Sequence, residues 1–101
     1  MIVIGGYIDF ASESDIGDVL DAGRVMAAAT LKEPGCIDYC FAVDITNATR
    51  IRVFEVWQDQ AALDAHMKSA HMIAFMAALG AAKRTGASVS AYAAGDVRKI
   101  I

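Results

Sequence analysis

The chain is poor in the residues that define several classes of small protein. It has one proline and only two cysteines among its 101 residues. Two cysteines are too few for the disulfide scaffold that stabilises many small secreted domains. Cys36 and Cys40 fall in one predicted strand, which would hold their Cα atoms about 13 Å apart, too far for a disulfide bond. We therefore expect two free, buried thiols in a reducing compartment and a cytoplasmic protein.

Long apolar runs and clusters of basic residues are also missing. No stretch approaches the roughly 18 consecutive apolar residues of a membrane-spanning helix, and we expect no signal peptide because the N-terminus lacks a basic segment. The nine lysines and arginines are scattered, and the formal net charge is −3. A phosphate backbone needs clustered positive charge. The sequence therefore argues against membrane insertion and against nucleic acid as a partner.

Apolar side chains, by contrast, are abundant. Hydrophobic residues make up 56% of the sequence, and the mean hydropathy is +0.42. A domain of this size cannot bury all of its apolar surface, and large exposed apolar patches usually mark interfaces. We expect part of the surface to be covered by a second copy of the same chain.

Residue patterns predict a single domain, residues 1–101, with the order β-α-β-β-α-β. This is the ferredoxin-like α+β arrangement, a four-stranded antiparallel sheet with helices on one face. The open face would be too apolar for water, so we expect two sheets to cover each other in a homodimer. The predicted elements are a strand 1–10, a helix capped by Ser12 or Ser14, strands 36–44 and 50–58, a helix capped by Asp59 from about 60 to 67, a continuation capped by Ser69, and a strand 87–94.

Alternation along the two central strands assigns their side chains to opposite faces. One face of the second strand is expected to carry a carboxylate between apolar residues, and such a carboxylate needs a partner if it is buried. On the second strand, one face is expected to carry Ile51, Val53, Glu55 and Trp57, and the other face Arg52, Phe54 and Val56. On the first strand, one face is expected to carry Ile37, Tyr39, Phe41 and Val43, and the other face Cys36, Asp38, Cys40 and Ala42.

Two segments, "EPGCIDYCFAVD" (33–44) and "RIRVFEVWQDQAALDAHMKSAHMIAF" (50–75), resemble the antibiotic biosynthesis monooxygenase family. The resemblance covers roughly residues 1 to 95. It implies a dimeric α+β barrel with a pocket between the sheet and the helices of each subunit. Several relatives oxidise quinols or polycyclic phenols with O₂ and without a metal or flavin, so no cofactor is expected. The family also contains haem-degrading enzymes, isomerases and members without known activity, so the fold does not determine the function.

The haem-degrading branch of the family fits this sequence poorly. That branch has a tryptophan on the second helix and an iron-ligating histidine about ten residues later. Here the matching positions are His66 and Met76, and the first strand lacks the expected asparagine. Haem degradation is therefore not expected.

His66 is the main candidate for a catalytic group, with Glu55 as a second. We expect His66 on the inner face of its helix with Met67, where an imidazole can act as a general base. The alternative is a structural imidazole bonded to a backbone carbonyl or to Glu55. For Glu55 itself, a structural ion pair with His66, with another strand or with a second subunit is favoured over catalysis.

His66 and His71 are not expected to bind a metal. On one continuous helix, five residues turn the two side chains about 140° apart. No cysteine or carboxylate at a suitable spacing completes a zinc site in the sequence. His71 is instead expected at a helix start and partly exposed, with a structural role favoured over a functional one.

The remaining candidates would bind a small aromatic substrate. Aromatic and methionine side chains at such positions are more often plain core, and that alternative stays open for each. The preferred function is a cofactor-independent monooxygenase acting on a quinol or another electron-rich aromatic. The alternatives are a non-catalytic dimer that binds a small apolar ligand and a cofactor-free isomerase. The candidate substrate-binding residues are Trp57, Tyr39, Phe54, Met67, His71 and Phe75.

Overall fold

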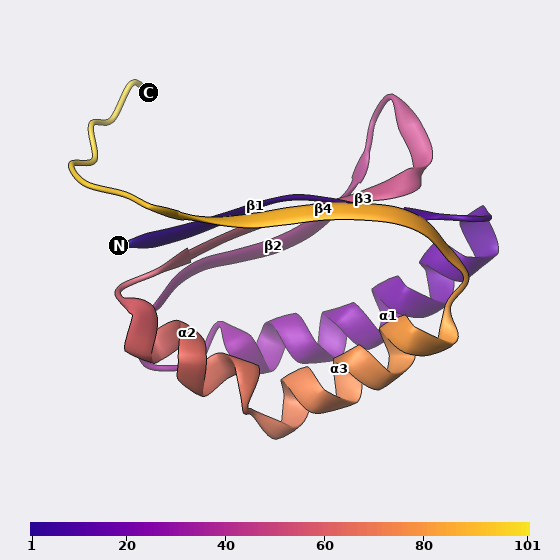
Figure 1. Cartoon of the computed structure of the whole chain (residues 1–101), viewed down its shortest axis with the longest axis horizontal. Helices are drawn as coiled ribbons and strands as arrows, with labels where there is room; N and C mark the ends of the chain where they lie inside the picture. The colour runs from indigo at the N-terminus through magenta and orange to yellow at the C-terminus, as the bar shows by residue number, and fades with distance from the viewer.

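The computed structural model describes all 101 residues as a four-stranded antiparallel sheet with three helices on one face (Figure 1). The sheet order is β2-β3-β1-β4, and every neighbouring pair is antiparallel. This confirms the predicted ferredoxin-like α+β fold. The elements are β1 (Ile2–Phe10), α1 (Glu13–Thr30), β2 (Cys36–Asp44), β3 (Asn47–Trp57), α2 (Gln60–Met67), α3 (Ala70–Ala81) and β4 (Arg84–Ala93).

Polar side chains begin the three helices, as the sequence predicts. Ser12, rather than Ser14, caps α1, and its hydroxyl accepts a hydrogen bond from the Asp15 N–H at 3.3 Å. Asp59 caps α2 by accepting from the Ala62 N–H at 2.9 Å. These caps satisfy backbone donors that no helical carbonyl can reach. None of the helices combines the length and hydropathy needed to cross a lipid bilayer.

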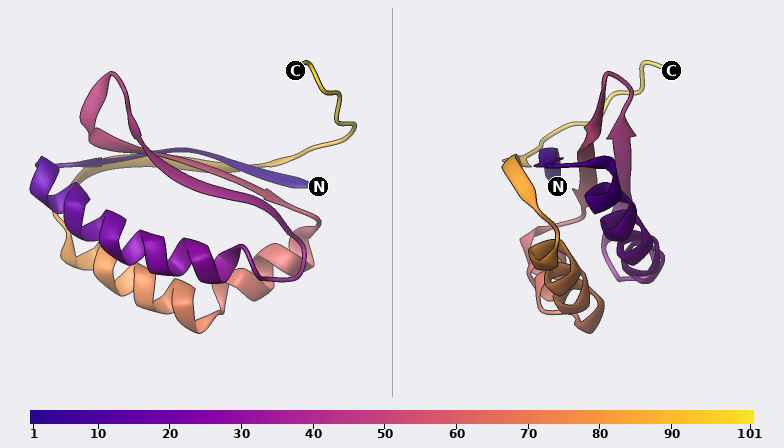
Figure 2. Two further views of the ribbon diagram at one scale, coloured as in Figure 1. Left: turned by 180° about the vertical axis from the view of Figure 1, so that it is seen from behind. Right: turned by 90° about the vertical axis from the view of Figure 1, so that its right-hand side faces the viewer.

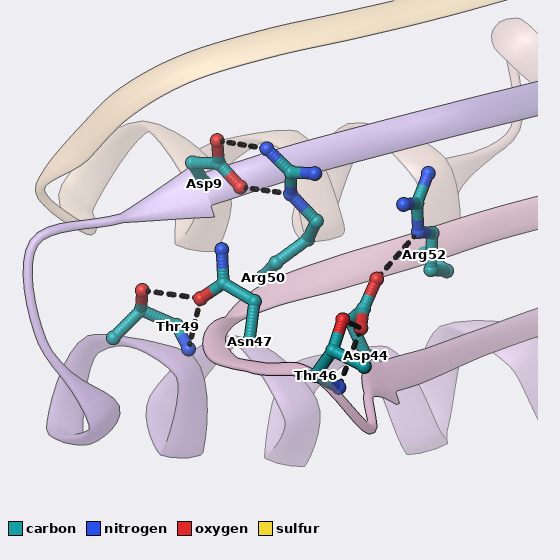
Figure 3. Close-up of polar contacts among 7 residues, drawn as sticks. All are labelled: Asp9, Asp44, Thr46, Asn47, Thr49, Arg50 and Arg52. Carbon is teal, nitrogen blue, oxygen red and sulfur yellow. Dashed lines mark hydrogen bonds and ion pairs between the residues drawn. The ribbon is translucent and has the colours of Figure 1, made fainter.

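The β2–β3 hairpin is longer than predicted because side chains close its turn. Asp44 accepts hydrogen bonds from both the N–H and the hydroxyl of Thr46 at 2.7 Å. Asn47 accepts from the N–H and the hydroxyl of Thr49 at 3.1 and 3.0 Å (Figure 3). The strand pairing therefore continues to Asn47, in a polar segment where hydrophobic alternation gives no signal.

The predicted faces of β3 are confirmed, but two positions on β2 are wrong: Cys36 pairs with Trp57 and packs against the core on the helix side, and Ile37 lies on the open face. Ile51, Val53, Glu55 and Trp57 are all buried on the helix side of the sheet. On β2 the register shifts between Cys36 and Asp38. This bulge turns Ile37 to the open face, where it is 58% exposed, because an extra residue reverses the alternation of side chains.

The thiols do not lie where the sequence predicted. Cys36 is half-buried and Cys40 is exposed, and both are free. Cys40 pairs with Phe54 on β3, and Phe54 is on the face that no helix covers. The expectation of two buried thiols is therefore wrong: Cys40 lies on the face that no helix covers, and Cys36, which packs against the core from the helix side, is only half-buried.

The β4 edge of the sheet is largely exposed to solvent on both faces. All ten residues of β4 are exposed, although β4 forms a full ladder with β1. The pairing is close: Gly6 has φ +153°, and a Cβ there would lie 2.0 Å from the Ser88 carbonyl oxygen. Figure 2 shows that the helices lie on one side of the sheet and leave the other bare. The apolar core accordingly sits between α1, α3 and the β3 half of the sheet.

The bare face has a polar end beside the hairpin (Figure 3). Arg50 donates two hydrogen bonds to Asp9, at 2.7 and 2.8 Å, and its guanidinium carbon lies 3.9 Å from the centre of the Tyr7 ring. Arg52 donates to Asp44 at 2.8 Å. The hydrogen bond from Arg50 lowers the pKa of Asp9. The two arginines are thus paired within this face, and Arg52 lies on the side of the sheet opposite Glu55, as predicted.

Candidate functional site

His66 lies at the centre of a buried aromatic cluster near the end of α2. Its side chain is 1% exposed. The ring centre lies 4.8 Å from that of Trp57 and 5.3 Å from that of Tyr39. Its Nδ1 lies 2.7 Å from the Oε2 atom of Glu33. The imidazole is therefore fixed on one side by a carboxylate and enclosed elsewhere by aromatic rings.

Glu33 is the residue that sequence reasoning missed. It lies in the turn between α1 and β2, next to Pro34 and Gly35. Its N–H donates to the Thr30 carbonyl at 2.9 Å, and its own carbonyl accepts from the Cys36 N–H at 3.2 Å. Backbone bonds on both sides thus fix the position from which the carboxylate reaches His66. The only sequence signal was an acidic residue just before the start of the strand that carries Tyr39 and Phe41.

Gly35 allows that turn to pack directly on α2. It has φ +82°, which L side chains rarely adopt, and a Cβ there would lie 2.6 Å from the Cβ of Ala62. The Gly35 carbonyl also accepts a hydrogen bond from the Gln58 N–H at 2.8 Å. The turn is therefore joined to the end of β3 and pressed against the helix that carries His66.

A break between α2 and α3 brings the two histidines together. The Ser69 hydroxyl donates to the His66 carbonyl at 2.6 Å and accepts from the Met72 N–H at 3.2 Å. The rings of His66 and His71 lie 5.9 Å apart, and His71 Nε2 is 3.2 Å from Glu33 Oε1. The expected divergence of the two side chains is wrong, because it assumed one continuous helix.

Glu55 is buried beside this cluster, and its partner is neither a histidine nor another strand. The Trp57 indole N–H donates to Glu55 Oε1 at 2.9 Å, from two residues along the same strand. Burial raises the pKa of Glu55, and the Trp57 hydrogen bond and His66 oppose that rise. The structure therefore shows a hydrogen bond from the neutral Trp57 indole in place of the ion pair that was favoured for Glu55.

Two polar atoms in the aromatic cluster of His66, Trp57 and Tyr39 have no hydrogen-bond partner. They are the Tyr39 hydroxyl and His66 Nε2, and both are fully buried. Burial also raises the pKa of Tyr39, so the phenol stays protonated and can donate. Unpaired buried polar atoms are rare in proteins and call for an explanation. Here they leave the Tyr39 hydroxyl as an unused hydrogen-bond donor and His66 Nε2 as an unpaired nitrogen, both among the same aromatic rings.

The other candidate substrate residues divide between the cluster and the surface. Phe75 is buried and packs on Phe41, with ring centres 5.3 Å apart. His71 is half-buried beside Glu33. Phe54 lies on the bare face of the sheet, on the far side from His66, and Met67 is 52% exposed. These two side chains therefore do not line the cluster around His66: Phe54 lies on the face opposite Glu55, and Met67 turns outward at the last residue of α2.

The pocket implied between sheet and helices is filled around His66 by aromatic side chains. A hollow of about 260 Å³ lies instead between α1 and α3, where Met26, His71 and Phe75 contribute to its wall. A second, of about 370 Å³, lies beside the turn before β2 and is bordered by Glu33 and Ala62. His66 thus lies behind His71 and Glu33, each of which reaches a surface hollow.

Comparison with known structures agrees with this architecture. A candidate antibiotic biosynthesis monooxygenase from Deinococcus radiodurans has a TM-score of 0.87, and the match covers 100% of this chain and 99% of that one. It is 23% identical, so it shows the fold alone. The structure of an antibiotic biosynthesis monooxygenase is 28% identical with a TM-score of 0.82, covering 95% of this chain and 100% of that one.

Similarity in sequence points the same way. An uncharacterized protein of Synechocystis sp. is 43% identical over 75 residues, which are 74% of this chain and 50% of that protein. The chain thus spans about half the length of this curated relative. The family model for antibiotic biosynthesis monooxygenase matches residues 1–78. The chain belongs to the antibiotic biosynthesis monooxygenase family.

Proposed function

We propose that the chain is a cofactor-independent monooxygenase that oxidises a quinol or another electron-rich aromatic with O₂. One observation carries the proposal: His66 is anchored through Nδ1 to Glu33, while its buried Nε2 has no partner. A carboxylate that accepts a hydrogen bond from Nδ1–H selects the tautomer in which Nε2 is the acceptor. Such an oriented imidazole is a suitable general base for a phenolic proton.

The proposed reaction starts when His66 takes the phenolic proton of the substrate. The phenolate gives one electron to O₂, the two radicals combine to form a C–O bond, and the O–O bond of the resulting peroxide then breaks. One oxygen atom stays on carbon as a carbonyl, and the other leaves as water with two hydrogens from the substrate. The substrate supplies all four electrons, so the protein has to provide a base and a dry, apolar environment.

The surroundings of His66 suit an aromatic guest. Trp57 and Tyr39 frame the imidazole, and the Tyr39 hydroxyl is a free donor that could hold a developing anion or peroxide. The hollow at His71 and Phe75 is the proposed side of entry, because it is apolar and ends at the second histidine. The rings must separate for a substrate to reach Nε2.

We also propose a homodimer formed through the bare sheet face. Phe54, Ile37 and Tyr92 are 46%, 58% and 59% exposed. Phe54 and Ile37 border an apolar hollow of about 560 Å³ that continues to Val97, beyond the end of β4. A monomer rarely leaves so much contiguous apolar surface in water. A second copy offers the same apolar surface and would cover it by two-fold symmetry.

One observation favours a second candidate function, a non-catalytic dimer that binds a small apolar ligand. The aromatic cluster is already closed, with Trp57 fully buried and Tyr39 5% exposed. Under this alternative, His66 and Glu33 join the turn to α2, and a ligand occupies only the hollow at His71.

Oxygen uptake by metal-stripped protein with a panel of quinols and polyphenols separates the two functions. We expect uptake above the autoxidation blank, and its loss in His66→Ala with the fold retained by circular dichroism. A matched control is Asp64→Asn, a change of an exposed side chain on the same helix. Absence of uptake across the panel, or equal uptake in His66→Ala, would reject the proposed role of His66.

A further inference from the structure

We infer that Glu33, His66 and His71 form a binding site for a divalent transition-metal ion such as Zn²⁺. Each of the three residues offers one donor atom, and these atoms lie within 4.8 Å of one another. Two imidazoles and one carboxylate are a ligand set that binds zinc and other first-row divalent metals in many proteins. The inference does not rest on the proposed oxidation. An ion bound through His66 Nδ1 would leave the ring proton on Nε2, so the metal-bound form could not use Nε2 as the base and the two roles belong to different states of the site.

The three donor atoms lie close to one another. Glu33 presents one oxygen to each histidine, Oε2 at 2.7 Å from His66 Nδ1 and Oε1 at 3.2 Å from His71 Nε2. Around a tetrahedral Zn²⁺ with bonds of about 2.0–2.1 Å, neighbouring donors lie about 3.3 Å apart. Because the three donor atoms lie within 4.8 Å of one another, their longest separation has to close by up to about 1.5 Å to enclose an ion, and one coordination position stays open.

The hydrogen bonding leaves the cluster incomplete without an ion. His71 Nε2 is buried and makes no hydrogen bond, although Glu33 Oε1 lies 3.2 Å away. A buried ring nitrogen without a partner is costly. A metal ion would use the lone pair of that nitrogen and would balance the negative charge of Glu33.

Three separate elements hold the donors, and each is fixed by its own backbone contacts. The turn before β2 positions Glu33, the last turn of α2 positions His66, and the Ser69 cap begins the helix that carries His71. A site whose ligands are fixed in advance loses little entropy when an ion binds. Such a site is more selective than a chance group of surface side chains.

An ion has a path to the site from the solvent. The side chain of Glu33 is 17% exposed and borders the hollow beside α2. The side chain of His71 is 24% exposed and borders the hollow between α1 and α3. His66 is enclosed behind them, so the ion would be reached from the Glu33 and His71 sides.

Co²⁺ titration of the chelator-treated full chain tests the inference. Co²⁺ substitutes for Zn²⁺ and reports its coordination through visible d–d absorption. We expect one saturable site per chain, competed by Zn²⁺, with binding that weakens as the pH falls and the imidazoles protonate. His71→Ala and Glu33→Gln should each weaken binding at least tenfold.

Two control variants separate this site from adventitious binding. Cys40→Ser removes an exposed thiol, and Asp64→Asn removes an exposed carboxylate on the helix that carries His66. Both should bind Co²⁺ as the unmodified chain does. Unchanged binding in His71→Ala and Glu33→Gln, or no binding by the unmodified chain, would overturn the inference.

A measurement on the unmodified chain covers the case in which a variant fails to fold. The chain has only two histidines, so their ring resonances are readily followed by NMR during Zn²⁺ addition. Both should shift with one equivalent of Zn²⁺, and binding that leaves either ring unchanged would contradict the site. Binding is read without substrate, so a protein that binds Zn²⁺ but takes up no O₂ rejects only the proposed oxidation.

Discussion

The indole N–H of Trp57 donates a hydrogen bond of 2.9 Å to Glu55, two residues earlier on the same face of β3. Both side chains are buried, at 0% and 7% exposure, so neither can turn to water for a replacement. Neighbouring positions on the buried face of a strand usually carry apolar side chains. Here the pair keeps a carboxylate inside the core at the edge of the aromatic cluster.

Replacing the donor should destabilise the protein. Trp57→Phe removes the N–H and leaves the Glu55 carboxylate without its hydrogen bond, in addition to creating a cavity. We expect a loss of about 2–5 kcal/mol in the free energy of unfolding, measured by urea denaturation. In the Glu55→Gln background the loss should be smaller, because a neutral amide tolerates a missing partner better. An equal loss in both backgrounds would show that the negative charge of Glu55 adds nothing to this hydrogen bond.

Glu55 should make the protein less stable as the pH rises. Burial raises its pKa above the ordinary value of 4.5, so just above that value the folded state binds more protons than the unfolded state. Its contribution to stability therefore falls from about pH 4.5 upward until the folded-state pKa has been passed. Glu55→Gln should gain stability relative to the unmodified chain over this window. Parallel stability curves for the two proteins would contradict the prediction.

The turn that carries Glu33 should not tolerate a side chain at Gly35. Gly35→Ala places a Cβ 2.6 Å from Ala62 at φ +82°, which we expect to cost roughly 1–3 kcal/mol and to move the Glu33 carboxylate away from His66. Gly17→Ala in α1 is the matched control, because a Cβ there meets nothing within 4 Å. It should stabilise the helix by about 0.5–1 kcal/mol. Thermal melts of both variants give the comparison, and a neutral Gly35→Ala would reject the close packing.

A charge on the bare sheet face should separate the proposed dimer. Phe54→Glu buries a carboxylate in the apolar contact if two sheets meet there, so we expect monomers by light scattering coupled to size exclusion. Ile73→Glu is the control, since Ile73 is 62% exposed but lies on α3, on the other side of the sheet. A dimer that survives Phe54→Glu and dissociates with Ile73→Glu would place the interface on the helices.

Local patterns predicted most of the fold. Asp59 and Ser69 marked helix starts because a cap is decided by a residue and its near neighbours. Alternation along β3 correctly assigned Glu55 and Trp57 to the buried face. Alternation along β2 failed at Ile37, because a bulge depends on how two strands pair and cannot be detected in the sequence of one strand.

The candidate site was only partly visible in the sequence. His66 was identified from its motif, but its contact with Glu33 joins residues 33 positions apart. The Ser69 cap was predicted, yet its consequence for His71 depends on the angle between two helices. Contacts of this kind are set by packing, so no spacing rule along the chain reveals them.

The Glu33–His66 hydrogen bond closes a loop that contains the whole hairpin. The turn at Ile45 and Thr46 projects from the far end of the sheet (Figure 1), and Ile45 is fully exposed there. The hairpin strands hold the two ends of this loop at a fixed separation. Extra residues at the hairpin tip would lengthen only the projection, whereas one extra residue in the turn after α1 would displace the carboxylate. The chain thus has one connection that can vary freely in length and one whose length is fixed by the histidines.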